Sequence, residues 1–249
     1  MSREIVRAVG ACVITFLICA VAYPFAVWGM GRLAFPKQAE GRLVLGGDQA
    51  VVGSDLIAQP FSTDKYFHPR PSAAGANGYA ADAASGSNLG SKNPALRDRI
   101  VLDTARILAS DGGETVLKTL LERLDAAQAE LKKKTDAGEK PEGLAADEAK
   151  VAATKTEIVA QLSRKDIPSR KPVPVDLVTA SGGGLDPDVT PEGARYQAAR
   201  VAAARKMTLN QVTALIDSHT DRSGAILGAP PTVNVLRLNL ALDGDAGKK

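Results

Sequence analysis

The feature that most constrains this chain is an uncharged run near its start. Residues 8–31 read AVGACVITFLICAVAYPFAVWGMG and include no charged side chain. About 20 apolar residues are enough for a helix to cross the hydrocarbon core of a bilayer, so this run predicts one transmembrane helix. Pro24 is expected to kink the helix, and Tyr23 and Trp28 suit the end that lies at the membrane interface.

A cleaved signal peptide is the alternative interpretation of the same run. Arg3 and Arg7 give it a basic start, and the residues AVA at Ala20–Ala22 resemble a cleavage site. The apolar run continues well past that site, which favours a membrane anchor. Positively charged residues on the two sides of the run are nearly balanced, so charge alone does not set the orientation.

The charge balance argues against a nucleic-acid-binding protein. The 249 residues carry a formal net charge of +3, and acidic and basic side chains are interspersed. Both cysteines, Cys12 and Cys19, lie inside the apolar run. The rest of the chain therefore has no disulfide, no cysteine ligand for zinc and no cysteine nucleophile.

Beyond the apolar run the composition changes twice. We predict a short terminus at 1–7, the membrane span at 8–31, and a soluble domain in two parts, 32–111 and 172–249, with a helical hairpin at 112–171 between them. The outer parts are rich in glycine, proline and short apolar runs. The middle stretch is rich in alanine, leucine, lysine and glutamate, a composition typical of helices.

The first part of the domain predicts two short strands and a long loop. Apolar runs at Leu43–Leu45 and Ala50–Val52 are separated by the turn signal GGD. Residues 73–94 contain too many turn formers for a regular element. They are therefore either disordered or a long loop held by its neighbours.

The middle stretch has a helical period, because its apolar side chains recur at spacings of three, four and seven. A polar turn, DAGEKPEG, separates two such runs. Their apolar residues are Val116, Leu117, Leu120, Leu121, Leu124 and Leu131, then Val151, Ile158 and Leu162. We predict two amphipathic helices in an antiparallel hairpin, which buries these side chains against itself rather than in the domain core.

The last part returns to a mixed pattern. Val173–Val178 predicts a short strand. Thr190 before Pro191 predicts a helix N-terminus, and Thr208 with Gln211 predicts a capping box on a further helix.

The run PTVNVLRLNLALD at 231–243 alternates well enough for a half-buried strand, with a bulge where Val235 and Leu236 break the alternation. The soluble part is therefore expected to be a mixed α/β domain.

No motif indicates a convincing catalytic site. The glycine-rich SGGGLD at 181–186 precedes a helix, but it lacks the lysine of a P-loop and the spacing of a dinucleotide-binding loop. A serine hydrolase would need Ser181 beside His68 or His219, the two histidines of the chain. His219 falls near the end of a predicted helix, where contact with the last carbonyl groups is the simpler interpretation.

Three carboxylates raise the question of a metal site. Asp176, Asp186 and Asp188 lie close together in the sequence. The residues LDPD are also typical of a turn that leads into a helix, and we favour the turn.

Five segments, in order, resemble a known family. They are VGSDLIAQPF followed by YFHPRPSA, then SGSNLGSKNP, PVDLVTASGGGLDPDVTPEGARYQAARVAAAR and VNVLRLNLALD. Behind one membrane span, they resemble the C subunit of the Kdp potassium-transporting ATPase, the KdpC family, over nearly the whole chain except about 112–171. Ala58 and Gly193 depart mildly from the family pattern, and the hairpin is an insertion relative to it.

The resemblance implies an accessory subunit that neither hydrolyses ATP nor conducts potassium. Its partners would be a channel-like subunit and a P-type ATPase subunit, and it would act as a catalytic chaperone for nucleotide binding. It would hold no cofactor firmly, with ATP affected through the complex and Gln197 as the position related to the nucleotide. The family topology implies a cytoplasmic N-terminus and an extracytoplasmic domain at the cell inner membrane.

The segment YFHPRPSA, residues 66–73, combines two prolines that stiffen the backbone with aromatic and forked donor side chains. We predict that Tyr66, Phe67, His68 and Arg70 form a partner-binding face. The alternative is a rigid loop whose aromatics only close the core of the domain. Two other classes of protein stay open, a membrane-anchored extracytoplasmic hydrolase and a secreted ligand-binding protein.

Overall fold

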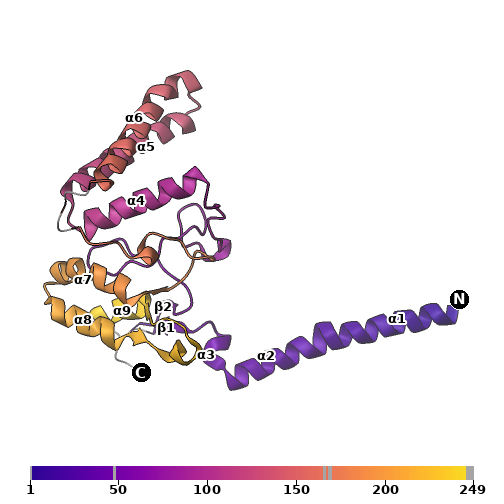
Figure 1. Cartoon of the computed structure of the whole chain (residues 1–249). Coiled ribbons are helices and arrows are strands. Elements are labelled where there is room, and N and C mark those ends of the chain that lie inside the picture. Colours follow the sequence, from indigo (N-terminus) through magenta and orange to yellow (C-terminus); the bar gives the residue numbers. More distant parts are fainter. Residues whose placement is uncertain (1, 47–48, 165–166, 168–169, 245–249) are drawn as a thin grey trace. The chain divides into compact units, whose positions relative to one another are not determined.

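A computed structural model describes residues 2–46, 49–164, 167 and 170–244 (Figure 1). The chain divides into two compact units, residues 1–56 and 57–249, and each is described by itself.

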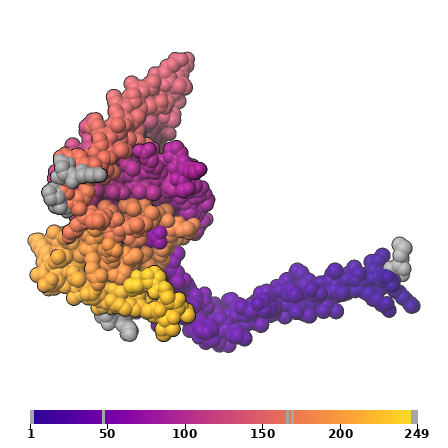
Figure 2. Space-filling model, viewed as in Figure 1, coloured from indigo at the N-terminus to yellow at the C-terminus, as the bar shows by residue number. Residues whose placement is uncertain are grey.

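The first unit begins with one long helix. It consists of α1 (Ser2–Phe16), the π-helical segment η1 (Leu17–Ala22) and α2 (Tyr23–Ala34). The stretch Arg3–Ala34 is long and apolar enough to cross a membrane, as predicted from length and composition. Its side chains are exposed along the whole rod (Figure 2).

Pro24 changes the hydrogen bonding of this helix. A proline has no N–H and clashes with the carbonyl group four residues earlier. The residues just before it adopt the wider π turn, in which the Tyr23 N–H donates to the carbonyl oxygen of Ile18, five residues back. The distortion expected at Pro24 is therefore absorbed by η1.

The rest of the first unit is small. The short helix α3 (Pro36–Ala39) leads to β1 (Leu43–Leu45), which pairs antiparallel with β2 (Val51–Ser54). Both predicted strands are present, and the second runs two residues further than expected.

The second unit carries most of the chain. Its elements are η2 (Ala81–Ala83), α4 (Pro94–Ser110), α5 (Thr115–Asp136), α6 (Pro141–Leu162), η3 (Val175–Leu177), β3 (Asp188–Val189), α7 (Pro191–Arg205), α8 (Leu209–Ser218), β4 (Thr220–Asp221), η4 (Ser223–Leu227), β5 (Thr232–Asn234) and α9 (Val235–Leu242). A small antiparallel sheet has the order β3-β5-β4. The fold is mixed α and β, as predicted, but helix dominates.

Two predicted strands are wrong. The run Val173–Val178 contains the single 3₁₀ turn η3, because Pro172 and Pro174 cannot donate to a sheet. The run 231–243 is a strand only to Asn234 and then becomes α9. The Asn234 side chain accepts a hydrogen bond from the Arg237 N–H at 3.1 Å and so caps a helix where we expected a bulge.

The predicted caps are confirmed. The Thr190 hydroxyl accepts a hydrogen bond from the Gly193 N–H at 2.9 Å and starts α7. Thr208 and Gln211 form the expected reciprocal box at the start of α8.

The antiparallel hairpin is confirmed, since cross-helix ion pairs join Arg123 of α5 to Glu157 of α6 at 2.9 Å and Lys134 to Asp147 at 2.6 Å. It does not bury its apolar face only against itself. Leu117, Leu120, Leu121, Leu124 and Ile158 form one cluster with Ala105 and Leu108 of α4. The apolar cluster is therefore enclosed by three helices, α4, α5 and α6. The sequence of the hairpin alone does not indicate the contribution of α4.

The main core is a separate cluster built by α7, α8, α9 and the strand β5. Its buried side chains include Val201, Val212, Ile216 and Leu238, and Phe67 enters it from the long N-terminal loop region. The segment predicted as a partner-binding face is therefore attached to the centre of the domain.

Candidate interaction site

Residues 64–70 (DKYFHPR), which we call the YFHPR segment after the last five of them, lie against α7 and α9 and are fixed there by buried side chains. Asn239 of α9 accepts a hydrogen bond from the Phe67 N–H at 2.8 Å and donates to the Phe67 carbonyl oxygen at 2.9 Å. Gln197 of α7 does the same for His68, at 2.8 Å and 3.0 Å. The side-chain amides of Asn239 and Gln197 thus bond the N–H and carbonyl groups of two successive residues, as the backbone of a neighbouring strand would do.

Burial makes these bonds consequential. Gln197 is 0% exposed and Asn239 is 1% exposed. A buried backbone donor or acceptor that loses its partner costs about 1–3 kcal/mol. The two amides therefore hold one backbone conformation of residues 67 and 68 and discriminate against others.

Arg200 is the centre of a second set of contacts. It lies three residues after Gln197 and so on the same face of α7. Its guanidinium donates to the carbonyl oxygens of Asp64 and Tyr66 at 2.9 Å and 3.0 Å, and to Gln197 Oε1 at 2.9 Å.

The fourth bond of Arg200 is an ion pair. Its Nε donates to Asp111 Oδ1 at 2.7 Å, and the two side chains are 5% and 0% exposed. A buried charge pair of this kind is tolerated when its remaining donors are satisfied, as they are here. The YFHPR segment is thereby tied to the end of α4 as well as to α7.

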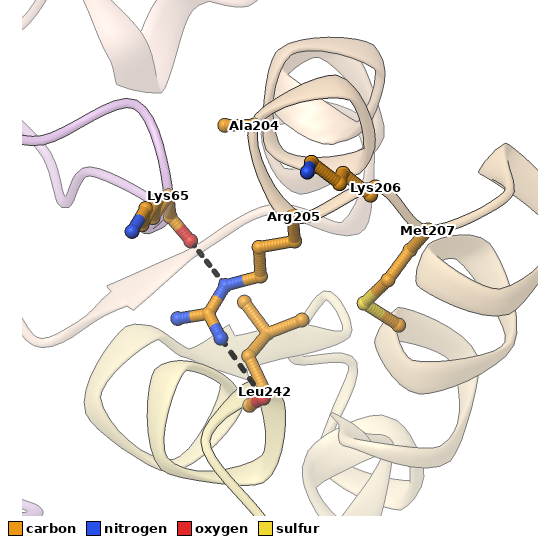
Figure 3. Close-up of a pocket in the computed structure, with 6 residues that line it drawn as sticks. All are labelled: Lys65, Ala204, Arg205, Lys206, Met207 and Leu242. Atoms are coloured by element: carbon orange, nitrogen blue, oxygen red, sulfur yellow. Dashed lines mark hydrogen bonds between the residues drawn. The ribbon is translucent and has the colours of Figure 1, made fainter.

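Arg205 holds the exposed edge of the YFHPR segment. Its Nε donates to the Lys65 carbonyl oxygen at 2.6 Å, and its Nη1 donates to the Leu242 carbonyl oxygen at 2.9 Å (Figure 3). Its guanidinium carbon lies 4.8 Å from the centre of the Tyr66 ring. The Tyr66 hydroxyl donates to Asp243 Oδ2 at 2.9 Å, a bond that raises the pKa of the phenol.

These residues also border a shallow pocket of about 320 Å³. It is lined by Lys65, Ala204, Arg205, Lys206, Met207 and Leu242. The guanidinium of Arg205 is already engaged by the chain's own carbonyl oxygens. Arg205 therefore lines the pocket with a side chain whose position is fixed by bonds within the domain (Figure 3).

The predicted face divides into a buried and an accessible part. The Phe67 ring is 0% exposed and belongs to the main core, so the expectation that it supplies surface contact area is corrected, and for this residue the core alternative holds. Tyr66, His68 and Arg70 are half-buried, and Asp64 and Lys65 are exposed. Alternating burial is the normal result when an extended segment covers a core.

His68 is held in its neutral form. Its Nε2 lies 3.2 Å from the Thr63 carbonyl oxygen, which the ring reaches as the Nε2–H tautomer. Burial, and next the positive charge of Arg200, lower the pKa of His68 below its ordinary value. The ring therefore adds bulk and a hydrogen bond, not charge, to the segment at neutral pH.

Arg70 links the YFHPR segment to the glycine-rich loop. Its Nη1 pairs with Asp186 Oδ2 at 3.0 Å, and its carbonyl oxygen accepts a hydrogen bond from the Tyr79 hydroxyl at 2.8 Å. Burial raises the pKa of Tyr79 to about 12, so the hydroxyl stays a donor.

The long loop at 73–94 is held by its neighbours. The Ser72 hydroxyl donates to the Gly184 carbonyl oxygen and accepts from the Tyr79 N–H at 2.8 Å. Gly184 has a φ of +72°, and a Cβ there would overlap the Ser85 carbonyl oxygen. Of the two alternatives for this loop, the ordered one is confirmed.

The candidate catalytic residues do not come together. Ser181 Oγ accepts a hydrogen bond from the Asp186 N–H at 3.3 Å. His219 ends α8, with Nδ1 at 2.9 Å from the Leu215 carbonyl oxygen, as the helix-end interpretation predicted. The contacts described for both histidines lie away from Ser181, so the geometry gives no support to a serine hydrolase.

The three carboxylates have structural roles. Asp176 Oδ2 accepts a hydrogen bond from the Thr190 N–H at 2.6 Å, and Asp186 Oδ1 accepts from the Asp188 N–H at 3.1 Å. Asp188 in turn accepts from Asn234 at 3.1 Å. The contact between Asp186 and the Asp188 N–H is that of the turn that we favoured.

Four residues of the site were not predicted: Asp111, Arg200, Arg205 and Asn239. They lie on helices that are far from the YFHPR segment in the sequence. The one available signal was the spacing of polar side chains on α7, where Gln197, Arg200 and Arg205 interrupt an alanine-rich helix.

The fold and the site together define a class of protein. It is a chain with one helix that could span a membrane and a mixed α and β unit in which buried polar contacts fix the backbone of the YFHPR segment.

Comparison with known proteins then gives the family. The family model described as K+-transporting ATPase, c chain (KdpC) matches residues 5–121 and 122–244. The potassium-transporting ATPase KdpC subunit of Polynucleobacter asymbioticus is 39% identical over 245 residues, 98% of this chain and 100% of the relative. The KdpC subunit of Mycobacterium tuberculosis is 38% identical over 243 residues, 98% and 99% of the two chains. This chain belongs to the KdpC family, the C subunits of potassium-transporting ATPases.

Proposed function

We propose that this chain is an accessory, non-catalytic subunit of a high-affinity, ATP-driven potassium uptake pump. Its partners are a channel-like subunit and a P-type ATPase subunit, as the KdpC family resemblance implies. It supports their assembly and acts as a catalytic chaperone for ATP binding by the ATPase subunit. The hydrolase and secreted-protein alternatives are not favoured by the family match.

One observation carries this proposal beyond the family match. The YFHPR segment is locked from behind by Asn239, Gln197 and Arg200, while Lys65, His68 and Arg70 keep accessible surface. A surface that is rigid before binding loses little conformational entropy when it binds. The YFHPR segment is therefore the surface by which we expect the chain to join the pump.

The membrane topology is part of the proposal. Residues 1–7 lie in the cytoplasm, residues 8–31 span the inner membrane, and the domain is extracytoplasmic. Trp28 and Arg32 support the placement of the outer interface, because the Arg32 guanidinium lies 5.5 Å from the centre of the Trp28 ring near the end of the span.

Any effect on ATP is expected to be indirect. Gln197, the position that the resemblance relates to the nucleotide, has no exposed surface, and both ends of its amide are bonded within the domain. Direct contact with ATP would require breaking the bonds that hold His68. We therefore propose that nucleotide binding is influenced through subunit contacts.

The helical hairpin is proposed to be an insertion into this domain. Its two ends are tied together, since Arg170 donates to both carboxylate oxygens of Glu114 at 2.7 Å and to the Leu162 carbonyl oxygen at 2.7 Å. A segment whose ends meet can be inserted between two residues of a fold without moving them apart.

The test is deletion of the chain in a strain where this pump is the one high-affinity route for potassium. Growth on micromolar potassium should be lost and should return with the wild-type chain. A Ser181→Ala variant should also restore growth, because we assign no catalysis to this hydroxyl and it lies outside the proposed joining surface. Unchanged growth of the deletion strain would contradict the proposed function, and failure of the folded Ser181→Ala variant would revive the hydrolase.

A further inference from the structure

The β1–β2 hairpin of the first unit has an apolar face that none of the described residues of that unit covers. Leu43 and Leu45 of β1 are 53% and 50% exposed, and Val51 of β2 is 57% exposed. Leu43 and Leu45 are two residues apart on β1 and so share a face, and Leu45 pairs with Val51 across the ladder, beyond a register shift between Val44 and Leu45. Residues that are directly opposite share a face, so these three apolar side chains lie together.

A two-stranded hairpin is at best marginally stable alone in water, and it needs a surface to pack against. The other face offers less apolar contact, because Val44 there is paired with Gly53, and Val52, at the register shift, is less exposed at 39%. Leu43, Leu45 and Val51 are therefore the side chains through which a covering surface would stabilise the hairpin.

The chain itself limits what this surface can be. The long helix ends at Ala34, and β1 starts nine residues later. Helix α3 turns the chain back, since Arg32 Nη2 pairs with Glu40 Oε1 at 2.6 Å. Residues next to the hairpin are thus held level with the last turn of the helix rather than extended away from it.

Further contacts fix the start of the hairpin at that level. The Ser54 hydroxyl donates to the Gly41 carbonyl oxygen at 2.6 Å, and Arg42 pairs with Asp55 at 3.9 Å. Basic side chains at Arg32, Lys37 and Arg42 and the aromatic ring of Trp28 are the residue types that favour the lipid headgroup region.

We propose that the β1–β2 hairpin lies on the bilayer, with Leu43, Leu45 and Val51 in the boundary between headgroups and acyl chains of the outer leaflet. This rests on the membrane span of the proposed function. The covering surface is lipid because the hairpin is tethered at the depth where the span leaves the bilayer.

The full chain, reconstituted in phosphatidylcholine vesicles, allows a direct test through its single tryptophan. Wild-type Trp28 reports the span. Two variants move the tryptophan to the apolar face, Trp28→Phe with Leu45→Trp and Trp28→Phe with Val51→Trp. The matched control, Trp28→Phe with Val44→Trp, places it on the opposite face of the same strand.

Fluorescence is compared in vesicles with and without lipid brominated near the headgroup end of the acyl chains. We expect bromolipid to quench Trp28 and both apolar-face variants to a similar extent, and the Val44→Trp variant clearly less. Quenching of Trp28 without quenching of the Leu45→Trp and Val51→Trp variants overturns the inference and leaves the span intact. Absence of quenching at Trp28 overturns the span itself, and equal quenching at Val44→Trp overturns the assignment of the face.

Discussion

The helical hairpin α5–α6 and the YFHPR segment belong to the same unit but are held by different forces. The hairpin buries a stripe of leucines against α4, and its Arg123–Glu157 ion pair is exposed. The YFHPR segment is held by hydrogen bonds from buried amides and a buried guanidinium. Apolar stripes tolerate many sequences, whereas a buried polar contact accepts one geometry. The difference predicts that the hairpin tolerates sequence changes that the YFHPR segment and its buried partners do not.

The largest effect should come from Arg200, where the two kinds of interaction differ most. Arg200→Met leaves the fully buried Asp111 carboxylate without its partner and frees the carbonyl oxygens of Asp64 and Tyr66. Removal of one partner of a buried ion pair costs about 3–5 kcal/mol. Thermal unfolding of the full chain in detergent, followed by circular dichroism, should show a large drop in Tm. The Arg200→Lys control keeps the positive charge but loses the several donors of the guanidinium. Its Tm should lie between those of the wild type and Arg200→Met.

Arg200→Met with an unchanged Tm would show that the polar contacts are not what hold the segment. The comparison between the two regions would then fail at its strongest point.

The next effect is expected at the glycine-rich loop. Gly184→Ala places a side chain in the left-handed region and against the Ser85 carbonyl oxygen, and the left-handed conformation alone costs about 1–2 kcal/mol. Gly183→Ala is the matched control, because its Cβ would meet open space. A lower Tm for Gly184→Ala alone is predicted, and equal values for both variants would mean that this loop is not packed as described.

A smaller, pH-dependent effect should come from His68. Because its pKa is lowered in the folded protein, the unfolded chain takes up the proton first, so stability is lost as the pH falls below about 6.5. His68→Gln removes this contribution. The Tm difference between wild type and variant should therefore change between neutral pH and pH values below that of free histidine. A Tm difference that does not change with pH would indicate that the His68 ring is exposed to solvent.

The smallest effect is expected at the far end of the helical hairpin. Its apolar cluster uses Leu117 to Leu124 and Ile158, near the base, with Val151 and Leu162 packed against it. Removal of 132–149, with Leu131 and Lys150 rejoined by a short glycine-serine turn, should leave the Tm nearly unchanged. Removal of all of 115–162 should lower it, since it exposes Ala105 and Leu108 of α4. An equal response to both deletions would contradict this division.

What the sequence could predict follows from the same contrast. Period and capping are local properties, so the long apolar helix, the two helices of the hairpin and the starts of α7 and α8 were predicted correctly. The strand expected at 231–243 failed because an alternating run was read without the cap at Asn234. The stripe on α4 was missed, as its partners are supplied by another segment.

The site was predicted only in part, for a physical reason. The YFHPR segment stood out by composition, but the side chains that fix it are up to 177 residues away in the sequence, as with Tyr66 and Asp243. Such pairs depend on the packing of α7 and α9 and leave no local pattern. For the same reason Phe67 appeared to be a surface aromatic, although the core needs its ring.

The most direct test of the central claim, that the YFHPR segment joins the chain to the pump, is co-purification of partner subunits from detergent-solubilised membranes. Asn239→Leu removes both bonds to Phe67 and should remain folded by circular dichroism yet recover clearly less of the partners than wild type. The variant lacking 132–149 should recover them fully. Full recovery with folded Asn239→Leu, or loss of the partners with the shortened hairpin, would contradict the account.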